Sequence, residues 1–217
     1  FGRLPTNISK SKKMRSSLLL IFPLWCFAVL TGFGQKGTFP ELTQLQGPQK
    51  PRAGFIVQAS TKGPADVRQS KQITSRLAAV IDGAYRALRR GGSSAAAVKS
   101  AARSIAALRM VGAFGIVALD AKGTLAAFSS DGVGNFAGPM CGSTSIGDTN
   151  AATETCADVQ RHAVPVGDAL KTFIARSKGG SHPNLTVLDA FGNMAFSEST
   201  DGLYVGYLAA DGRAVIR

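Results

Sequence analysis

The sequence predicts an α+β fold: a two-layer sandwich in which helices cover one face of an antiparallel sheet. The main observation is a strand–turn–strand segment that occurs twice, at residues 117–132 and 187–202, each time after a helix-like segment. Short strands joined by tight turns pair antiparallel, and helices that precede them can cover one face of the sheet. We therefore expect an α+β domain at residues 66–217 with two helix–hairpin units in one sheet.

Two helices are predicted at the start of this domain. The first spans about residues 66–90, where apolar side chains recur at three- and four-residue spacing, and stops at Gly91-Gly92. Ser93 or Ser94 can cap the second, which ends by Gly112. The expected buried stripes are Ile73, Leu77, Val80, Ile81, Ala84 and Leu88 in the first helix and Ala97, Val98, Ala101, Ala102, Ile105 and Leu108 in the second.

The hairpins follow from turn chemistry. Strands at 114–120 and 124–130 flank an Asp-Ala-Lys-Gly turn, and a second hairpin is expected at 185–198. Further strands are predicted at 202–209 and 213–217, and Asp168 is predicted to cap a third helix. Residues 131–165 are rich in Gly, Ser and Thr and poor in large apolar side chains, so we expect a long functional or mobile loop there.

The region before the domain is basic. Residues 1–65 carry nine Lys or Arg and one acid, net +8, whereas residues 66–217 are net +4. An uncharged apolar run at 18–30 follows four basic residues and is short for a hydrocarbon core of about 30 Å. Residues 1–33 therefore predict a basic N-terminus with a cleavable signal peptide or an uncleaved signal anchor. Residues 34–65 contain four prolines and predict a linker; Phe55-Ile56-Val57 can dock as an edge strand or belong to a disordered tether.

The cysteines bear on the compartment. Cys26 lies inside the apolar run, and Cys141 and Cys156 lie fifteen residues apart in the polar segment. If the domain is exported, Cys141 and Cys156 are candidates for a disulfide; in a reducing compartment they are free thiols. Asn184-Leu185-Thr186 fits the N-glycosylation pattern, which matters only in the secretory pathway. The expected location is the secretory pathway, a periplasm or an organelle lumen, membrane-anchored if the signal stays.

Reactive residue types are sparse. His162 and His182 lie in predicted loops without metal-ligand neighbours, so neither a metal site nor a cofactor is predicted. The carboxylates are explained by turns and caps, and no catalytic set is assigned. The candidate site loop consists of Ser129, Ser130, Asp131 and Asn135, in a stretch that can expose backbone N–H groups to an anion. No dense Lys/Arg patch with interleaved aromatics occurs in residues 66–217, so no nucleic-acid partner is predicted.

Three segments resemble a known family. Residues 113–127 read AFGIVALDAKGTLAA, and residues 192–196 and 200–204 read GNMAF and TDGLY. They resemble the start and end of the β-subunit in asparaginase-like Ntn hydrolases, where a Thr-Val-Gly-Ala-Val-Ala-Leu-Asp segment begins with the nucleophilic threonine. That position is Ala113 here, which has no hydroxyl. Residues 129–132 read SSDG where the family has Thr-Ser-Thr-Gly-Gly. The resemblance therefore implies a truncated, inactive member.

A second resemblance is to extracytoplasmic Cache-type sensor domains. Leu108-Arg109, Phe114, Asp120 and Gly123 are similar in order to the Leu-Arg, aromatic strand and Asp-x-x-Gly turn of those domains. This resemblance implies a small-molecule pocket over the sheet, covered by residues 131–165.

The leading hypothesis is an exported or membrane-tethered, non-catalytic α+β module that binds a ligand or a protein partner. The alternatives are an asparaginase-like amidohydrolase and an accessory subunit of a membrane assembly. The basic N-terminus can also contact an anionic membrane surface.

Overall fold

The computed structural model describes residues 41–45, 53–131, 134–177, 183–198, 202–209 and 211–217. Four helices and ten strands lie within these ranges. The helices are α1 (Val67–Arg89), α2 (Ser94–Ala106), α3 (Ala151–His162) and α4 (Val166–Arg176). The strands are β1 (Glu41–Leu45), β2 (Gly54–Thr61), β3 (Val111–Leu119), β4 (Leu125–Ser129), β5 (Asn135–Ala137), β6 (Cys141–Ile146), β7 (Asn184–Asp189), β8 (Met194–Glu198), β9 (Leu203–Leu208) and β10 (Ala214–Ile216).

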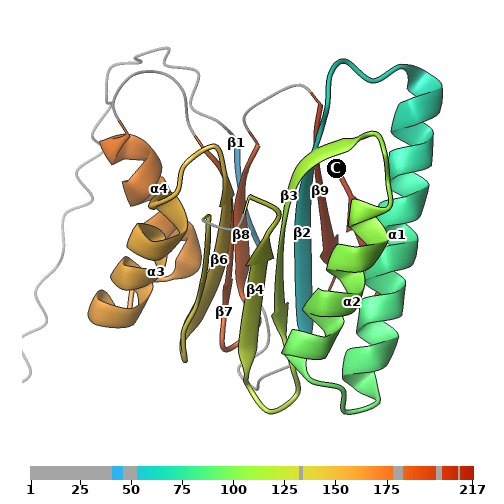
Figure 1. Cartoon of the computed structure of the whole chain (residues 1–217). Coiled ribbons are helices and arrows are strands. Elements are labelled where there is room, and N and C mark those ends of the chain that lie inside the picture. Colours follow the sequence, from blue (N-terminus) through green and yellow to red (C-terminus); the bar gives the residue numbers. More distant parts are fainter. Residues whose placement is uncertain (1–40, 46–52, 132–133, 178–182, 199–201, 210) are drawn as a thin grey trace, which may run out of the picture. The chain divides into compact units, whose positions relative to one another are not determined.

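The strands form two antiparallel sheets, so the α+β class is confirmed but the expectation of a single sheet is corrected. Sheet A has the order β1-β8-β7-β6-β5, and sheet B has the order β10-β9-β2-β3-β4. In Figure 1 the two sheets stand face to face, with α3 and α4 on the outer face of sheet A and α1 and α2 on the outer face of sheet B. Helices thus cover two sheet faces instead of one.

Three apolar clusters fill the spaces between these layers. One lies between sheet B and α1 and α2, a second between sheet A and α3 and α4, and the third between the sheets. Strand alternation explains the division, because successive side chains of a strand point to opposite faces. In β2, Phe55 and Val57 face the helices while Ile56 faces sheet A. Both faces of each sheet are therefore buried, which the sequence analysis did not anticipate.

Helices α1 and α2 form as the sequence predicts. Asp66 and Gln69 make a capping box at the start of α1, with Gln69 N–H donating to Asp66 Oδ1 at 2.7 Å. Ser93 caps α2 by accepting from Ala96 N–H at 3.3 Å. The predicted stripes face sheet B, although Val80 and Leu108 are only partly buried.

The repeated segment forms one hairpin in each sheet. Asp120 directly follows β3 and Asp189 ends β7. Each Oδ1 accepts two backbone N–H groups of its own turn. Asp120 makes one further bond, because its Oδ2 accepts the N–H of Ser94 in the first turn of α2 at 3.2 Å. Burial raises the pKa of Asp120, but these backbone hydrogen bonds outweigh it and hold the pKa below the ordinary value. Each hairpin follows a pair of helices, and the two helix–hairpin units lie in different sheets.

The predicted linker at 34–65 contains two strands, and one of them is central. Strand β2 pairs with β3 on one side and β9 on the other, so Phe55-Ile56-Val57 belongs to the middle of sheet B instead of an edge or a tether. Strand β1 pairs with β8 at the edge of sheet A. The domain therefore begins well before residue 66.

The predicted loop at 131–165 contains β5, β6 and α3. A disulfide between Cys141 in β6 and Cys156 in α3 ties this region together, with the Cα atoms 5.5 Å apart and both residues fully buried. The prediction for Asp168 also needs correction. Helix α4 begins after Pro165 without a side-chain cap, and Asp168 lies in its first turn, where its Oδ1 is 3.4 Å from Lys171 Nζ.

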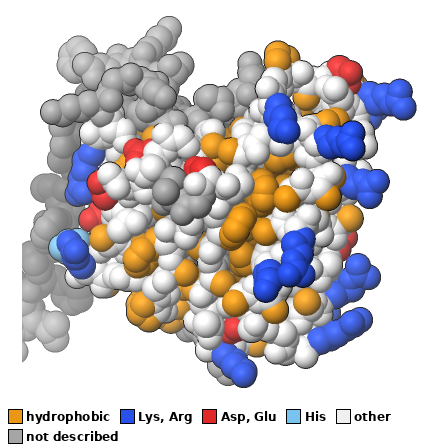
Figure 2. Space-filling model, in the orientation of Figure 1, with side chains coloured by type: hydrophobic (Ala, Val, Ile, Leu, Met, Phe, Trp, Pro, Cys, Tyr) orange, Lys and Arg blue, Asp and Glu red, His pale blue; other side chains and the backbone are white. Residues whose placement is uncertain are grey.

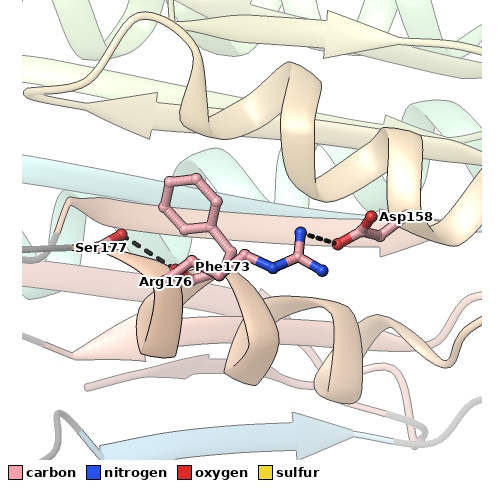
Figure 3. Close-up of polar contacts among 4 residues, drawn as sticks. All are labelled: Asp158, Phe173, Arg176 and Ser177. Carbon is pink, nitrogen blue, oxygen red and sulfur yellow. Dashed lines mark hydrogen bonds and ion pairs between the residues drawn. The ribbon is translucent and has the colours of Figure 1, made fainter.

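Polar contacts join the two helices that cover sheet A. Arg176 of α4 reaches Asp158 of α3, with Nη1 and Oδ2 3.2 Å apart (Figure 3). In the same view, Ser177 Oγ donates to the carbonyl oxygen of Phe173 at 3.0 Å and closes the end of α4 (Figure 3). The disulfide thus joins α3 to β6 of sheet A, and the ion pair joins α3 to α4.

Candidate functional site

The predicted site loop gathers at the end of β4, where its polar groups are used for local structure. Ser129 Oγ donates to Asp131 Oδ1, which also accepts from Gly134 N–H at 3.3 Å. Ser130 Oγ accepts from Phe114 N–H at 2.8 Å, and Asn135 pairs with Thr144 between β5 and β6. The structure thus brings Ser129, Ser130 and Asp131 into one turn beside β5. Their contacts close the hairpin. Among the residues that the structure describes, no histidine or cationic side chain is hydrogen-bonded to Ser129 Oγ.

A polar row crosses the space between the sheets, and the sequence analysis missed it. Gln58 of β2 donates from Nε2 to the carbonyl oxygen of Thr144 in β6 at 3.0 Å, and Thr144 Oγ1 lies 2.8 Å from Thr186 Oγ1 of β7. All three residues are fully buried, and Gln58 Oε1 has no hydrogen-bond partner among the described residues. Strand alternation assigns these positions to the inter-sheet face. A pattern search for reactive residues cannot detect them, because they are amides and hydroxyls scattered over the chain.

Gly115 allows the two sheets to approach each other closely at this polar row. A Cβ atom at Gly115 would lie 2.4 Å from Thr144 Oγ1 and 2.6 Å from Thr144 Cβ, far inside contact distance. Gly115 pairs with Gln58 across β2 and β3. The absence of a side chain at this position therefore lets Thr144 reach sheet B.

Ala113, the position that resembles the nucleophile of the asparaginase-like hydrolases, lies inside β3. Its N–H donates to Ser60 Oγ at 3.1 Å, and the Ser60 hydroxyl donates back to the Ala113 carbonyl oxygen at 3.1 Å. Gly112 precedes it in the strand, so Ala113 has neither a hydroxyl nor a free α-amino group to start amide attack. The contacts of Ala113 are those of a paired strand residue.

The described residues hold no assembled metal-binding cluster. No three His, Cys, Asp or Glu side chains among them are placed to hold a metal ion. His162 is exposed at the end of α3, and His182 lies outside the described residues.

The strongest surface feature of the domain is the charge of the α1–α2 layer. Residues 66–110 carry nine Lys or Arg and two Asp, net +7, whereas residues 111–217 carry seven Lys or Arg and ten acids, net −3. The nine are Arg68, Lys71, Arg76, Arg86, Arg89, Arg90, Lys99, Arg103 and Arg109. Figure 2 shows Lys and Arg side chains (blue) around hydrophobic side chains (orange) on this side of the molecule. This patch is not evident in the sequence, because the cations are spread over 45 positions and gather only when the two helices pack.

A groove runs between α1 and α2, and we call it the α1–α2 groove. It has a volume of about 700 Å³. Its lining consists mostly of small side chains, with Arg76 and Arg109 as its charged members: Gln72, Arg76, Ala79, Val80, Gly83, Ala84, Ala87, Ala97, Ser100, Ala101, Ser104, Ala107, Leu108, Arg109 and Met110. The alanines of α2 have small side chains that allow α2 to pack closely, and several of them also line this groove.

The two cations of the groove differ from the two cations of α4. Arg176 and Lys171 on α4 have carboxylate partners at 3.2 and 3.4 Å. Arg76 and Arg109 have no ion-pair partner within the described ranges. Guanidinium groups without an intramolecular partner, placed beside an apolar surface, can form ion pairs with the carboxylates of a binding partner.

Only some of the residues behind the targeting and modification predictions belong to the described ranges. The apolar run at 18–30 and Cys26 lie outside the described residues. Among the helices that the structure does describe, none combines the length and apolar character needed to cross a membrane. Asn184 of the glycosylation pattern is half-buried at the start of β7, and its Thr186 is fully buried against Thr144.

Comparison with models of known protein families gives no match to this chain, and comparison with curated protein sequences gives none either. The geometry described above therefore carries the functional argument. Both resemblances stated for the sequence remain predictions.

Proposed function

We propose that this protein is a non-catalytic binding module, exported or membrane-tethered, that holds a protein partner in its α1–α2 groove as an accessory subunit of a larger assembly. The observation that carries the proposal is the groove itself. It has a volume of about 700 Å³, a lining of mostly small side chains, and two arginines without an ion-pair partner in the described part of the chain. Concave apolar surfaces with a few well-placed polar groups are the usual form of a binding site. A net charge of +7 on this layer adds electrostatic selection of a partner.

Ala113 and the contacts of Ser129 support a non-catalytic role. Catalysis of amide hydrolysis needs an activated nucleophile and a base within hydrogen-bond reach. Ala113 lacks the nucleophile, and Ser129 contacts a carboxylate that is already engaged with the turn. The buried disulfide between Cys141 and Cys156 supports an oxidising compartment, since such bonds persist there.

Position-specific crosslinking of the full chain tests the proposal. A photoreactive amino acid at Ser100, which is exposed in the groove, is compared with one at Ala175, which is exposed on α4. We expect one discrete protein adduct from Ser100 in native membranes or extracts and none from Ala175. Equal adducts from both positions would reject the groove as the binding surface.

An activity assay tests the amidohydrolase alternative. The full chain is incubated with asparagine and with isoaspartyl peptides, and released aspartate is measured. We expect no release. Release that disappears in Ser129→Ala or Ser130→Ala would overturn the proposal in favour of the asparaginase-like class.

N-terminal sequencing of the mature protein tests the location. A start after the apolar run indicates a cleaved signal, and a retained run indicates an anchor. A mature protein with reduced Cys141 and Cys156 would contradict an oxidising compartment.

A further inference from the structure

We infer that the occupant of the α1–α2 groove is an amphipathic helix with carboxylates along its flanks, supplied by another protein. This inference rests on the proposed function and adds the chemistry of the partner. It is argued from the length of the groove, its lining and its charge.

The length and lining of the groove suit a helix. Its lining residues on α1 run from Gln72 to Ala87, which at 1.5 Å per residue covers about 22 Å. That length matches about four turns of a bound helix, and helix-in-groove binding is a common recognition mode. Exposed Ala79, Gly83 and Ala87 on α1 and exposed Ser100 and Ser104 on α2 let a third helix approach closely.

The charge of the groove selects an acidic partner. Arg76 and Arg109 line it without ion-pair partners in the described part of the chain, and Lys99 and Arg103 are exposed on α2. The only acid within the α1 sequence is Asp82, which is exposed but does not line the groove. A partner with Glu or Asp on both sides of an apolar stripe would meet these cations on binding.

Neither this chain nor a second copy supplies such a helix. Residues 1–40 are net +6, so this N-terminal segment and a layer of net +7 repel each other. Helices α3 and α4 carry three acids and three Lys or Arg between them, and Arg176 and Lys171 already pair with two of those acids. None of these segments supplies the complementary charge, which is why we assign the groove to a helix of another protein.

A membrane surface and a nucleic acid fit the groove less well. Among the described residues, the exposed large apolar side chains are Val67, Phe128, Met140 and Phe191, and only Val67 belongs to α1 or α2. A lipid-inserting helix presents large apolar side chains to the bilayer, which this concave surface does not. Tyr85, the aromatic residue of α1, has Arg89 over its ring at 5.6 Å and does not line the groove, so the groove offers no aromatic face for base stacking.

The test uses a synthetic peptide of about 20 residues, helical, with Leu and Ala on one face and Glu on both flanks. Binding to the full chain is measured by fluorescence anisotropy. The comparison probes are the same peptide with Lys in place of Glu, a scramble of the acidic peptide, phosphatidylserine vesicles and a 20-nucleotide single-stranded DNA. We expect saturable binding of the acidic amphipathic peptide and at least roughly tenfold weaker binding of each peptide control.

Two variants connect binding to the groove. The double variant Arg76→Glu with Arg109→Glu is expected to weaken binding roughly tenfold or more. Arg161→Glu, at an exposed position of α3, is expected to leave binding unchanged. Gly83→Leu separates binding from folding, because a Cβ there meets no atom within 4 Å and Leu is the better helix former. We expect Gly83→Leu to raise the thermal unfolding midpoint and to lower peptide affinity at least tenfold, while Ala175→Leu changes neither affinity nor fold.

Each outcome decides the inference. Vesicle or DNA binding that exceeds peptide binding, equal affinity of the acidic peptide and its scramble, or unchanged affinity in Gly83→Leu would overturn it. If the Ser100 crosslink succeeds while the acidic peptide fails to bind, the binding module stands and the acidic-helix partner is rejected. If the crosslink also fails, the proposed function falls with it.

Discussion

The carboxylate of Asp120 links the first hairpin to the start of α2, and its removal is expected to destabilise the domain. Its Oδ1 accepts from Lys122 and Thr124 N–H at 3.0 Å each, and its Oδ2 accepts from Ser94 N–H at 3.2 Å. The turn residues are exposed, so water replaces their bonds in Asp120→Ala. Ser94 is 1% exposed, and a buried N–H without a partner costs about 1–3 kcal/mol.

We therefore expect Asp120→Ala to lose about 2–4 kcal/mol of unfolding free energy when the turn bonds are included. The chain offers a matched control in Asp189, which is 6% exposed. Its Oδ1 accepts the two corresponding turn N–H groups, whereas its Oδ2 accepts from Asn193 Nδ2 at 2.7 Å within the same turn instead of from a helix N–H. Asp189→Ala is expected to lose about 1–2 kcal/mol less than Asp120→Ala. Urea unfolding followed by circular dichroism at pH 7 measures both losses. Equal losses would refute the role assigned to the Ser94 bond.

The same carboxylate gives a pH test with a defined sign. Its pKa is lowered in the folded protein, whereas an unfolded Asp titrates near about 3.9. Between the two values the unfolded chain binds more protons, so stability falls as the pH falls. The difference in unfolding free energy between the natural protein and Asp120→Ala should be constant above about pH 5 and shrink below about pH 4. A difference that grows on acidification would contradict the lowered pKa.

Two further predictions concern packing between layers. The double variant Cys141→Ala with Cys156→Ala should lose about 3 kcal/mol of unfolding free energy, because the disulfide no longer closes the fifteen-residue loop in the unfolded chain. Urea unfolding measures this loss. Two free thiols in the native protein would contradict the disulfide. Gly115→Ala should lose at least about 1–3 kcal/mol, since the added Cβ meets Thr144 at 2.4 Å. Gly63→Ala, whose Cβ meets nothing within 4 Å, is its control, and similar losses for both would contradict close approach of the sheets.

The sequence predicted the parts of the fold whose signals are local. The apolar stripe of α1 and the Asp-x-x-Gly turns of both hairpins depend on residues within a few positions of one another, and Ile73, Leu77 and Ile81 are fully buried as expected. Turn chemistry could not tell whether the hairpins share a sheet. That choice depends on β2, which pairs with residues up to 151 positions away at Ile56 and Tyr207.

The missed elements lack large apolar side chains. Strand β6 reads CGSTSI, so most of its buried residues are small or carry a hydroxyl group. One of them, Thr144, makes hydrogen bonds between the sheets. Helix α3 starts without a side-chain cap and buries Ala151, Ala152, Thr155, Cys156 and Val159, a weak stripe by composition. Both were assigned to a loop because polarity usually indicates exposure.

The candidate site was missed for a different reason. The predicted loop at Ser129–Asp131 was chosen by residue type, and its polar groups are used within the turn. The α1–α2 groove depends on which faces of two helices remain open after they pack on sheet B. Arg76 and Arg109 are 33 positions apart in the sequence, and no spacing rule connects them.

The central place of β2 affects the order in which the domain can be assembled on the ribosome. Strand β2 is synthesised before its helices, but its partner β9 emerges about 150 residues later. At about 5–20 residues per second, this leaves a nascent Phe55-Ile56-Val57 segment without one neighbour for roughly 8–30 seconds. During that interval a chaperone or translocation factor can bind this extended apolar segment. Mutations that delay the pairing of β9 with β2 should increase aggregation of the nascent chain before they change the folded domain.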